Sequence, residues 1–259
     1  MDDPAGPNPA RAPITYEHRR AQVPWRSVFG EANRALAIAP EWEGPHDLYA
    51  MALARSGWSE ALDFNVERST ADQAWQEVVR WAEMADTQPG GLWRRGRMDR
   101  WAQALDRLGQ NDAAAAIRSR PAPVPDLPTK IRFGDALDLV GVDLPREVRP
   151  GDVATVRFHW RLAQPLRQDY WAFLHVRGLR KKLNQDQPIG GRSFGTSIWV
   201  SGEEVRQSVT FRVPADTPPG SYPLHTGVWL PWTGKQLRAT TDLPIKRRAV
   251  VLGRLTVAR

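Results

Sequence analysis

Histidine, tryptophan and phenylalanine alternate with aliphatic residues along two stretches in the second half of the chain. The aromatic and imidazole residues at alternate positions are Trp171, Phe173 and His175 in 170–177, and His225 and Trp229 in 222–230. Successive side chains of a β-strand point to opposite faces of its sheet. The pattern therefore predicts that these five side chains face away from the aliphatic core.

A surface of this composition is suited to binding sugars. An indole ring offers a flat apolar platform, and imidazole, carboxylate and guanidinium groups form directional hydrogen bonds with hydroxyls. Asp186 and Trp199, from the segment between the two stretches, are the remaining candidates. The alternative is that the helical half of the chain or the 178–198 loop covers these aromatic residues. Trp171 would then be an interdomain contact.

Catalytic chemistry has little support in the sequence. His159, His175 and His225 stand on separate predicted strands, and no HxH or HExxH spacing indicates a metal site. Asp186 with Glu203 and Glu204 would supply a glycosidase acid and base if two carboxyl groups lay roughly 5–10 Å apart. Because no GxSxG, P-loop or dinucleotide-binding glycine pattern occurs, we expect a protein without catalytic residues, metal or cofactor.

Charge is distributed unevenly along the 259 residues. Residues 1–122 carry 15 basic and 17 acidic side chains, whereas residues 123–259 carry 21 and 12, a balance of +9. A basic module favours polyanions, so polyanion binding is one alternative function. Nucleic acid is not the expected partner, because in the basic segment 93–101 Trp93, Arg97 and Trp101 share one helical stripe, as expected for packing over a helix core.

The first half of the chain has a helical pattern after a Pro-rich tail, residues 1–24. Apolar residues recur at helical spacing between 25 and 119, including a stripe from Met98 to Leu108 with Gly109 placed to end it. The segments 50–57 and 102–109 resemble one another, as in degenerate tetratricopeptide repeats, although an ordinary helical bundle fits equally well. This domain is expected to bind a protein partner.

The second half is predicted to be a β-sandwich. A Pro-rich linker, 120–130, precedes eight short apolar runs separated by Gly, Pro and Asp, with no helical pattern among them. The runs are 130–134, 137–145, 153–162, 169–178, 197–200, 205–214, 221–231 and 248–257. The stretch 211–229 is predicted to be a hairpin. The expected fold class is therefore α+β, with a helical, tetratricopeptide-like domain at 25–119 and an antiparallel, immunoglobulin-like sandwich at 131–259.

Several spaced elements of the β half resemble a known module. They are an Asp-Tyr strand with Phe173 to His175, an Asp-x-Pro-x-Gly loop from Asp186 to Gly190, Trp199, Gly202-Glu203, and the closing stretch 211–229. In this order they resemble the β-sandwich at the carboxyl end of bacterial polytopic membrane glycosyltransferases. The resemblance implies a non-catalytic appendage at the cell envelope that contacts glycan. Transferase activity is not implied, because no run is long and apolar enough to span a bilayer.

These observations predict a two-domain binding protein. The helical half would dock a protein, and the sandwich would bind a glycan or an envelope protein. The alternatives are a glycan-active hydrolase that uses the loop carboxylates and a polyanion-binding module. The amino terminus has no apolar core of a secretory signal, which predicts a cytoplasmic chain, whereas the resemblance implies association with the cell envelope.

Overall fold

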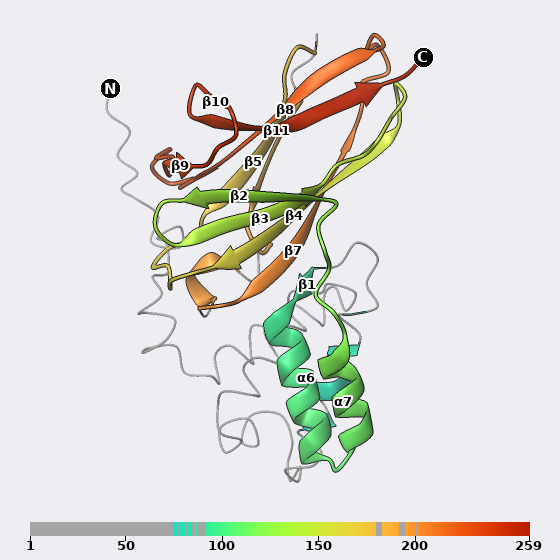
Figure 1. Ribbon diagram of the computed structural model, residues 1–259, viewed down its shortest axis with the longest axis vertical. Coiled ribbons are helices and arrows are strands. Elements are labelled where there is room, and N and C mark those ends of the chain that lie inside the picture. Colours follow the sequence, from blue (N-terminus) through green and yellow to red (C-terminus); the bar gives the residue numbers. More distant parts are fainter. Residues whose placement is uncertain are drawn as a thin grey trace, which may run out of the picture.

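Two antiparallel sheets packed face to face make up most of the computed structural model (Figure 1). The structure describes residues 92–259 apart from 180–182, 192–194 and 200, together with residues 75, 76, 78–80, 82, 83 and 86. The predicted tail at 1–24 and the repeat copy at 50–57 lie outside these residues. The predicted β-sandwich is confirmed.

Six strands form the first sheet, here sheet A. In spatial order they are β1 (Trp93–Arg94), β7 (Glu204–Arg212), β4 (Val153–Leu162), β3 (Leu137–Asp143), β2 (Leu127–Phe133) and β9 (Ala239–Thr240). The longest pairing joins β4 to β7 over nine residue pairs, from Val153↔Arg212 to Arg161↔Glu204. Strand β2 begins at Leu127, so the sandwich starts inside the segment that was predicted to be linker.

Five strands form the second sheet, here sheet B. In spatial order they are β10 (Ile245–Lys246), β11 (Ala249–Val257), β8 (Gly220–Trp229), β5 (Trp171–Val176) and β6 (Leu183–Pro188). Strand β5 lies between β8 and β6, and β6 is an edge strand. The chain crosses from sheet B to sheet A between β8 and β9, and returns to sheet B at β10.

The inner faces of the two sheets enclose the hydrophobic core. Trp160 is almost fully buried and lies 6.1 Å from Phe133 and 5.5 Å from Phe158, ring centre to ring centre. From sheet B, Leu174, Val228 and Leu255 are completely buried against them. This burial explains the aliphatic half of each alternating pattern in the sequence, because burying apolar surface is the main favourable contribution to folding.

Three sequence predictions for the sandwich are wrong. Residues 211–229 are not a hairpin, because β7 belongs to sheet A and β8 to sheet B, so the Pro-rich connection crosses between sheets. The run 197–200 is not a strand, since Thr196–Ile198 form a 3₁₀ helix, η2. Strand β6 was missed because its sequence, LNQDQP, is polar.

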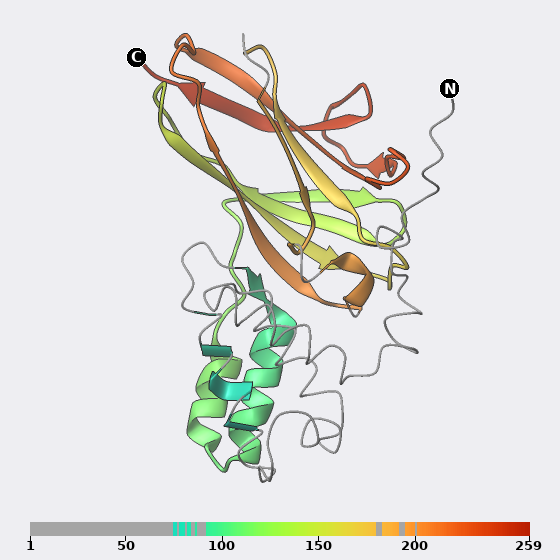
Figure 2. The same ribbon diagram turned by 180° about the vertical axis from the view of Figure 1, so that it is seen from behind.

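Two helices stand below sheet A (Figures 1 and 2). Helix α6 spans Arg95–Arg107 and helix α7 spans Asn111–Ser119. Gly109 ends α6 with φ +72°, and the amides of Gly109 and Gln110 bond to the carbonyls of Asp106 and Leu105, as a Schellman cap requires. Within the described part of the chain, no helix is both long and apolar enough to cross a membrane.

A second, smaller core holds these helices together. Its buried members are Ala82, Met98, Trp101, Ala102, Leu105, Ala114 and Ile117. The predicted stripe from Met98 to Leu108 is thus the buried face of α6 as far as Leu105, whereas Leu108 at its end is half-buried. The tetratricopeptide-like arrangement stays a prediction, because most of residues 25–91 lie outside those described.

Glu203 joins the helical pair to the sandwich. Strand β1 extends sheet A by pairing with β7, and α6 follows directly. The Glu203 carboxylate accepts a hydrogen bond of 3.0 Å from the Gly96 amide, in the first turn of α6. It also lies 3.7 Å from the Arg94 guanidinium, and both side chains are almost completely buried. A carboxylate from the sandwich thus satisfies a helix N-terminus that has no side-chain cap of its own.

Glu203→Ala is therefore expected to destabilise the fold. Removing one partner of a buried ion pair leaves a buried charge uncompensated, at a cost of roughly 3–5 kcal/mol. The neighbouring Glu204 provides a matched control, because its pair with Arg161 is largely exposed and Glu204→Ala should cost less than about 1 kcal/mol. Urea unfolding of both variants tests this, and equal losses would contradict the role given to Glu203.

Candidate functional site

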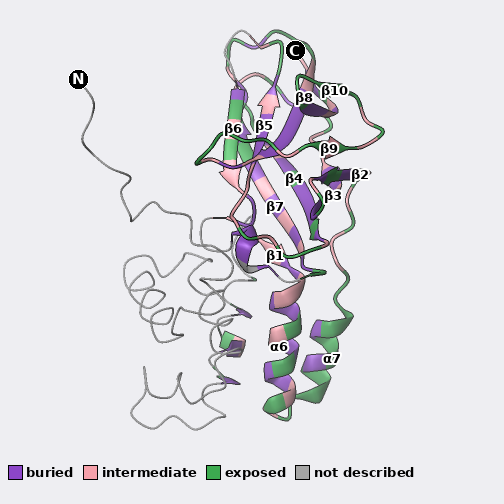
Figure 3. Cartoon of the chain, turned by 90° about the vertical axis from the view of Figure 1, so that its left-hand side faces the viewer, coloured by how far each residue is buried: buried purple, intermediate pink, exposed green. Residues whose placement is uncertain are grey.

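The outer face of sheet B brings together most of the predicted site residues. The β5–β8 register pairs Trp171 with Trp229 and His175 with His225. The β5–β6 register places Asp186 opposite Phe173. The predicted orientation of these residues, away from the aliphatic face, is confirmed. Figure 3 shows β6 exposed beside β5 on this side of the molecule.

Two indole rings form the apolar part of this face. The rings of Trp171 and Trp229 are 6.2 Å apart and inclined at 76°, an edge-to-face contact. Both residues are half-buried, and Pro188 of β6 extends the same cross-strand row beside Trp171. Two nearly perpendicular rings give an angled apolar surface, on which a flat ligand can lie against one ring while its edge meets the other.

A short hydrogen-bond chain forms the polar part. The Arg177 guanidinium donates to His175 Nδ1 over 3.3 Å, and His175 Nε2 lies 3.1 Å from Asp186 Oδ1. Because a guanidinium has no acceptor, His175 Nδ1 must be unprotonated, so Nε2 carries the hydrogen and donates to Asp186. Arg177 and Asp186 are both exposed, and a donor and an acceptor therefore stand at opposite ends of the imidazole.

Both histidines on this face are held neutral. Burial lowers the pKa of His175, and the hydrogen bond with Asp186 only partly opposes this. Burial is also the main cause of the lowered pKa of His225, followed by the positive charges of Arg177 and Lys246. Both imidazoles are thus able to donate and accept hydrogen bonds at neutral pH.

Phe173 is an internal support of the face. It is 5% exposed, and its ring stacks on the His175 imidazole at 4.4 Å. It also covers Gly227, where an added Cβ would lie 2.5 Å from Phe173 Cζ. Phe173 therefore orients His175 and is too buried to form a platform for a ligand.

Trp199 is not part of the surface. It is completely buried in the sandwich core. The turn before it is tied to the residues preceding β5, because the Ser197 amide donates to Asp169 Oδ1 and the Tyr170 amide donates to Thr196 Oγ1. Trp199 was included among the candidates only through the resemblance, and the structure gives it a packing role.

The carboxylates of the hydrolase hypothesis are not assembled. Asp186 lies on the outer face of sheet B, whereas Glu204 pairs with Arg161 on the outer face of sheet A. Glu203 is buried against α6. The third histidine, His159, is on sheet A and contacts Asp143 at 3.0 Å. Among the described residues no group of His, Cys, Asp and Glu could hold a metal ion.

The basic segment 93–101 is used for packing. Arg94 and Arg97 are buried, and so are Met98 and Trp101 of the same segment. The Arg95 guanidinium lies over the ring of Trp93 at 5.3 Å. This agrees with the expectation that Trp93, Arg97 and Trp101 pack over a helix core.

Arg177, Gly227 and Lys246 were missed at this face. Arg177 continues the alternation of Phe173 and His175, so extending the two-residue period by one more step would have identified it. Gly227 lies between His225 and Trp229 in the same way. Nothing in the sequence near Lys246 indicates that β10 adds to this sheet, because a two-residue strand gives no periodic signal.

Comparison with known proteins adds only distant structural neighbours. No family model and no curated protein matches the chain. A Niemann-Pick type C2 protein from the Japanese carpenter ant matches at 8% identity and TM-score 0.32, over 50% of this chain and 98% of its own. The C-terminal domain of wzt matches at 13% identity and TM-score 0.33, over 55% and 84%. A CARDB domain from Pyrococcus furiosus matches at 15% identity and TM-score 0.26, over 53% and 97%.

Acid should weaken the fold through His175 and His225. Their pKa values in the folded protein lie below the ordinary value of 6.5, so the unfolded chain takes up protons first as the pH falls. The contribution of the two neutral histidines to the free energy of unfolding is therefore fully present above about pH 6.5. It is lost progressively as the pH falls below that value. We expect the melting temperature to fall between about pH 7.5 and pH 5.5, and to fall less in a His175→Gln/His225→Gln variant. An unchanged pH dependence in that variant would show that other groups govern it.

Proposed function

We propose that this protein is a non-catalytic glycan-binding module and that the outer face of β5, β6 and β8 is its binding surface. The observation that carries the proposal is the juxtaposition of the half-exposed Trp171–Trp229 pair with the Arg177–His175–Asp186 chain on one sheet face. Sugars are recognised by this combination, since their C–H faces pack on aromatic rings and their hydroxyls need both donors and acceptors.

The rigidity of the strands supports this assignment. Each of these side chains stands on a paired strand or directly follows one, and His175 is fixed by a hydrogen bond at each ring nitrogen. A preorganised surface loses little conformational freedom on binding, which favours affinity for a flexible polymer. Asp186 and Arg177 are also exposed, so their polar groups are accessible to a ligand on this face.

The separation of the carboxylates supports binding without hydrolysis. Asp186 and Glu204 lie on opposite sides of the sandwich, and Glu203 is engaged with α6. A glycosidase needs two carboxyl groups on either side of one glycosidic bond. The adaptor role for the helical half stays a prediction.

Loss of one indole should abolish most of the binding. A glycan array probed with the full chain identifies a ligand, and titration calorimetry with that ligand compares the variants. Trp171→Ala should weaken binding about tenfold or more, because a stacked aromatic side chain contributes roughly 1.5–3 kcal/mol.

Arg161→Ala is the matched control, since Arg161 occupies an exposed ion pair on the outer face of sheet A. Its affinity should equal that of the wild type. Absence of any glycan ligand, or equal weakening by both variants at unchanged melting temperature, would refute the proposed surface.

A further inference from the structure

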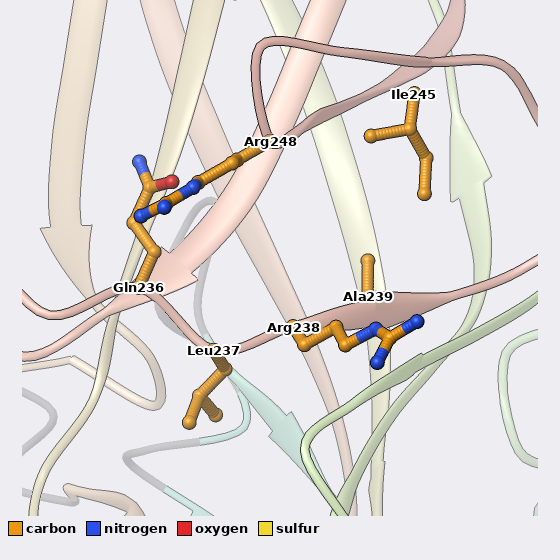
Figure 4. Close-up of a pocket in the computed structure, with 6 residues that line it drawn as sticks. All are labelled: Gln236, Leu237, Arg238, Ala239, Ile245 and Arg248. Carbon is orange, nitrogen blue, oxygen red and sulfur yellow. The ribbon is translucent and has the colours of Figure 1, made fainter.

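Strand β9 is an edge strand of sheet A, and strand β10 is an edge strand of sheet B. Two chain segments lie side by side at this edge of the sandwich (Figures 1 and 2). The first is the tight turn after β8, closed by a hydrogen bond from the Gly234 amide to the Leu230 carbonyl. The second is the turn between β10 and β11. Residues 236–239, which follow the first turn, line an open groove of about 490 Å³ together with Ile245 of β10 and Arg248 of the second turn (Figure 4).

The backbone of the second turn is strained. Lys246 pairs with Ala249, so Arg247 and Arg248 are the two central residues of the turn. Their φ angles are +50° and +67°, and they are the only non-glycine residues with positive φ among those described. Such a turn favours Asn-Gly, because a Cβ is disfavoured in this region. Two arginines in this backbone conformation destabilise the fold. Their presence indicates that the side chains have a role other than stabilising the turn.

Positive charge dominates these segments. Between 235 and 248 there are five basic side chains, Lys235, Arg238, Lys246, Arg247 and Arg248, and one acidic side chain, Asp242, a balance of +4. All five basic residues are exposed. Within the described part of the chain none of them forms an ion pair with a carboxylate. This charge is therefore available to an external partner.

Large apolar side chains are exposed at the same place. Trp232, in the turn after β8, is 49% exposed, and Ile245, beside the arginine turn, is 47% exposed. Indole and aliphatic side chains flanked by lysine and arginine are typical of surfaces that enter the boundary between lipid head groups and acyl chains. An exposed isoleucine has no planar ring for stacking on a nucleobase, so this composition favours lipid over nucleic acid.

We propose that this edge of the sandwich, Trp232 with Lys235, Arg238 and 245–248, docks onto an anionic lipid bilayer. The cations would lie among the anionic head groups, while Trp232 and Ile245 would enter the interface. Apart from Lys246, which also lies near His225, this site shares no residue with the glycan surface, and it does not depend on glycan binding. Docking would hold the neighbouring outer face of sheet B close to a membrane.

Co-sedimentation of the full chain with vesicles tests the proposal. Binding is expected for vesicles that contain phosphatidylglycerol and phosphatidylcholine, and not for phosphatidylcholine alone. The decisive variant is Arg247→Asn/Arg248→Gly, which removes two charges while installing the residues that this turn prefers. We expect its melting temperature to stay the same or rise and its vesicle affinity to fall about 30-fold.

A matched control removes two arginines from the opposite end. Strand β3 begins next to Gly134, whose amide bonds to the Arg238 carbonyl, and runs away from the proposed edge. The connection after β3 holds the exposed Arg146 and Arg149. Arg146→Asn/Arg149→Asn should bind vesicles as the wild type does.

A third variant tests the apolar side chains of the edge. Trp232→Ala/Ile245→Ser should weaken vesicle binding at unchanged net charge.

Three results would overturn the proposal. They are equal binding to charged and neutral vesicles, equal loss in the edge variant and the control, and binding to inorganic polyphosphate or single-stranded DNA without binding to vesicles. The last result would make the edge a polyanion site. None of them bears on glycan binding, which is measured in the absence of lipid.

Discussion

The register between β5 and β8 is the constraint on which this structure depends. It pairs Trp171 with Trp229 and His175 with His225, and a slip of one residue in either strand would turn that strand's two residues toward the core. Two contacts hold it. The buried Thr226 hydroxyl donates to the Phe173 carbonyl over 2.7 Å. The absence of a side chain at Gly227 lets the Phe173 ring lie across the neighbouring strand. The surface therefore exists because the core beneath it admits only one alignment.

Periodicity alone predicted much of this arrangement. The alternation in 170–177 and 222–230 placed the aromatic and imidazole groups on the outer faces, because a strand with one aliphatic face can be buried in only one way. The same reasoning failed for β6, which carries polar residues on an edge where no burial is required. It also failed at 213–219, because a proline-rich connection has the same sequence pattern in a hairpin within one sheet and in a crossing between two sheets. The position of β6 came only from its pairing with β5.

The residues that carry the family resemblance serve mainly to join parts of the fold. Trp199 fills the core, and Glu203 fixes the first turn of α6. Gly190 has φ +82°, and the side-chain Nε2 of Gln207 donates to the Pro188 carbonyl over 2.8 Å. His175, Asp186 and, in the closing stretch of the pattern, His225 lie on the strands of the outer face. A pattern of this kind thus predicts the sandwich well and says little about a ligand. The proposed glycan surface relies as well on Trp171, Arg177 and Trp229.

Indole signals followed during a glycan titration would show directly whether the outer face of sheet B binds glycan. The full chain, labelled with ¹⁵N at its indole nitrogens, would be titrated with the oligosaccharide selected on the array, with each signal assigned by a Trp→Phe variant. Glycan binding at this face should move the Trp171 and Trp229 signals with a common affinity, while those of the buried Trp160 and Trp199 stay in place. Movement confined to Trp232, or to Trp93 of sheet A, would show that glycan does not bind at this face.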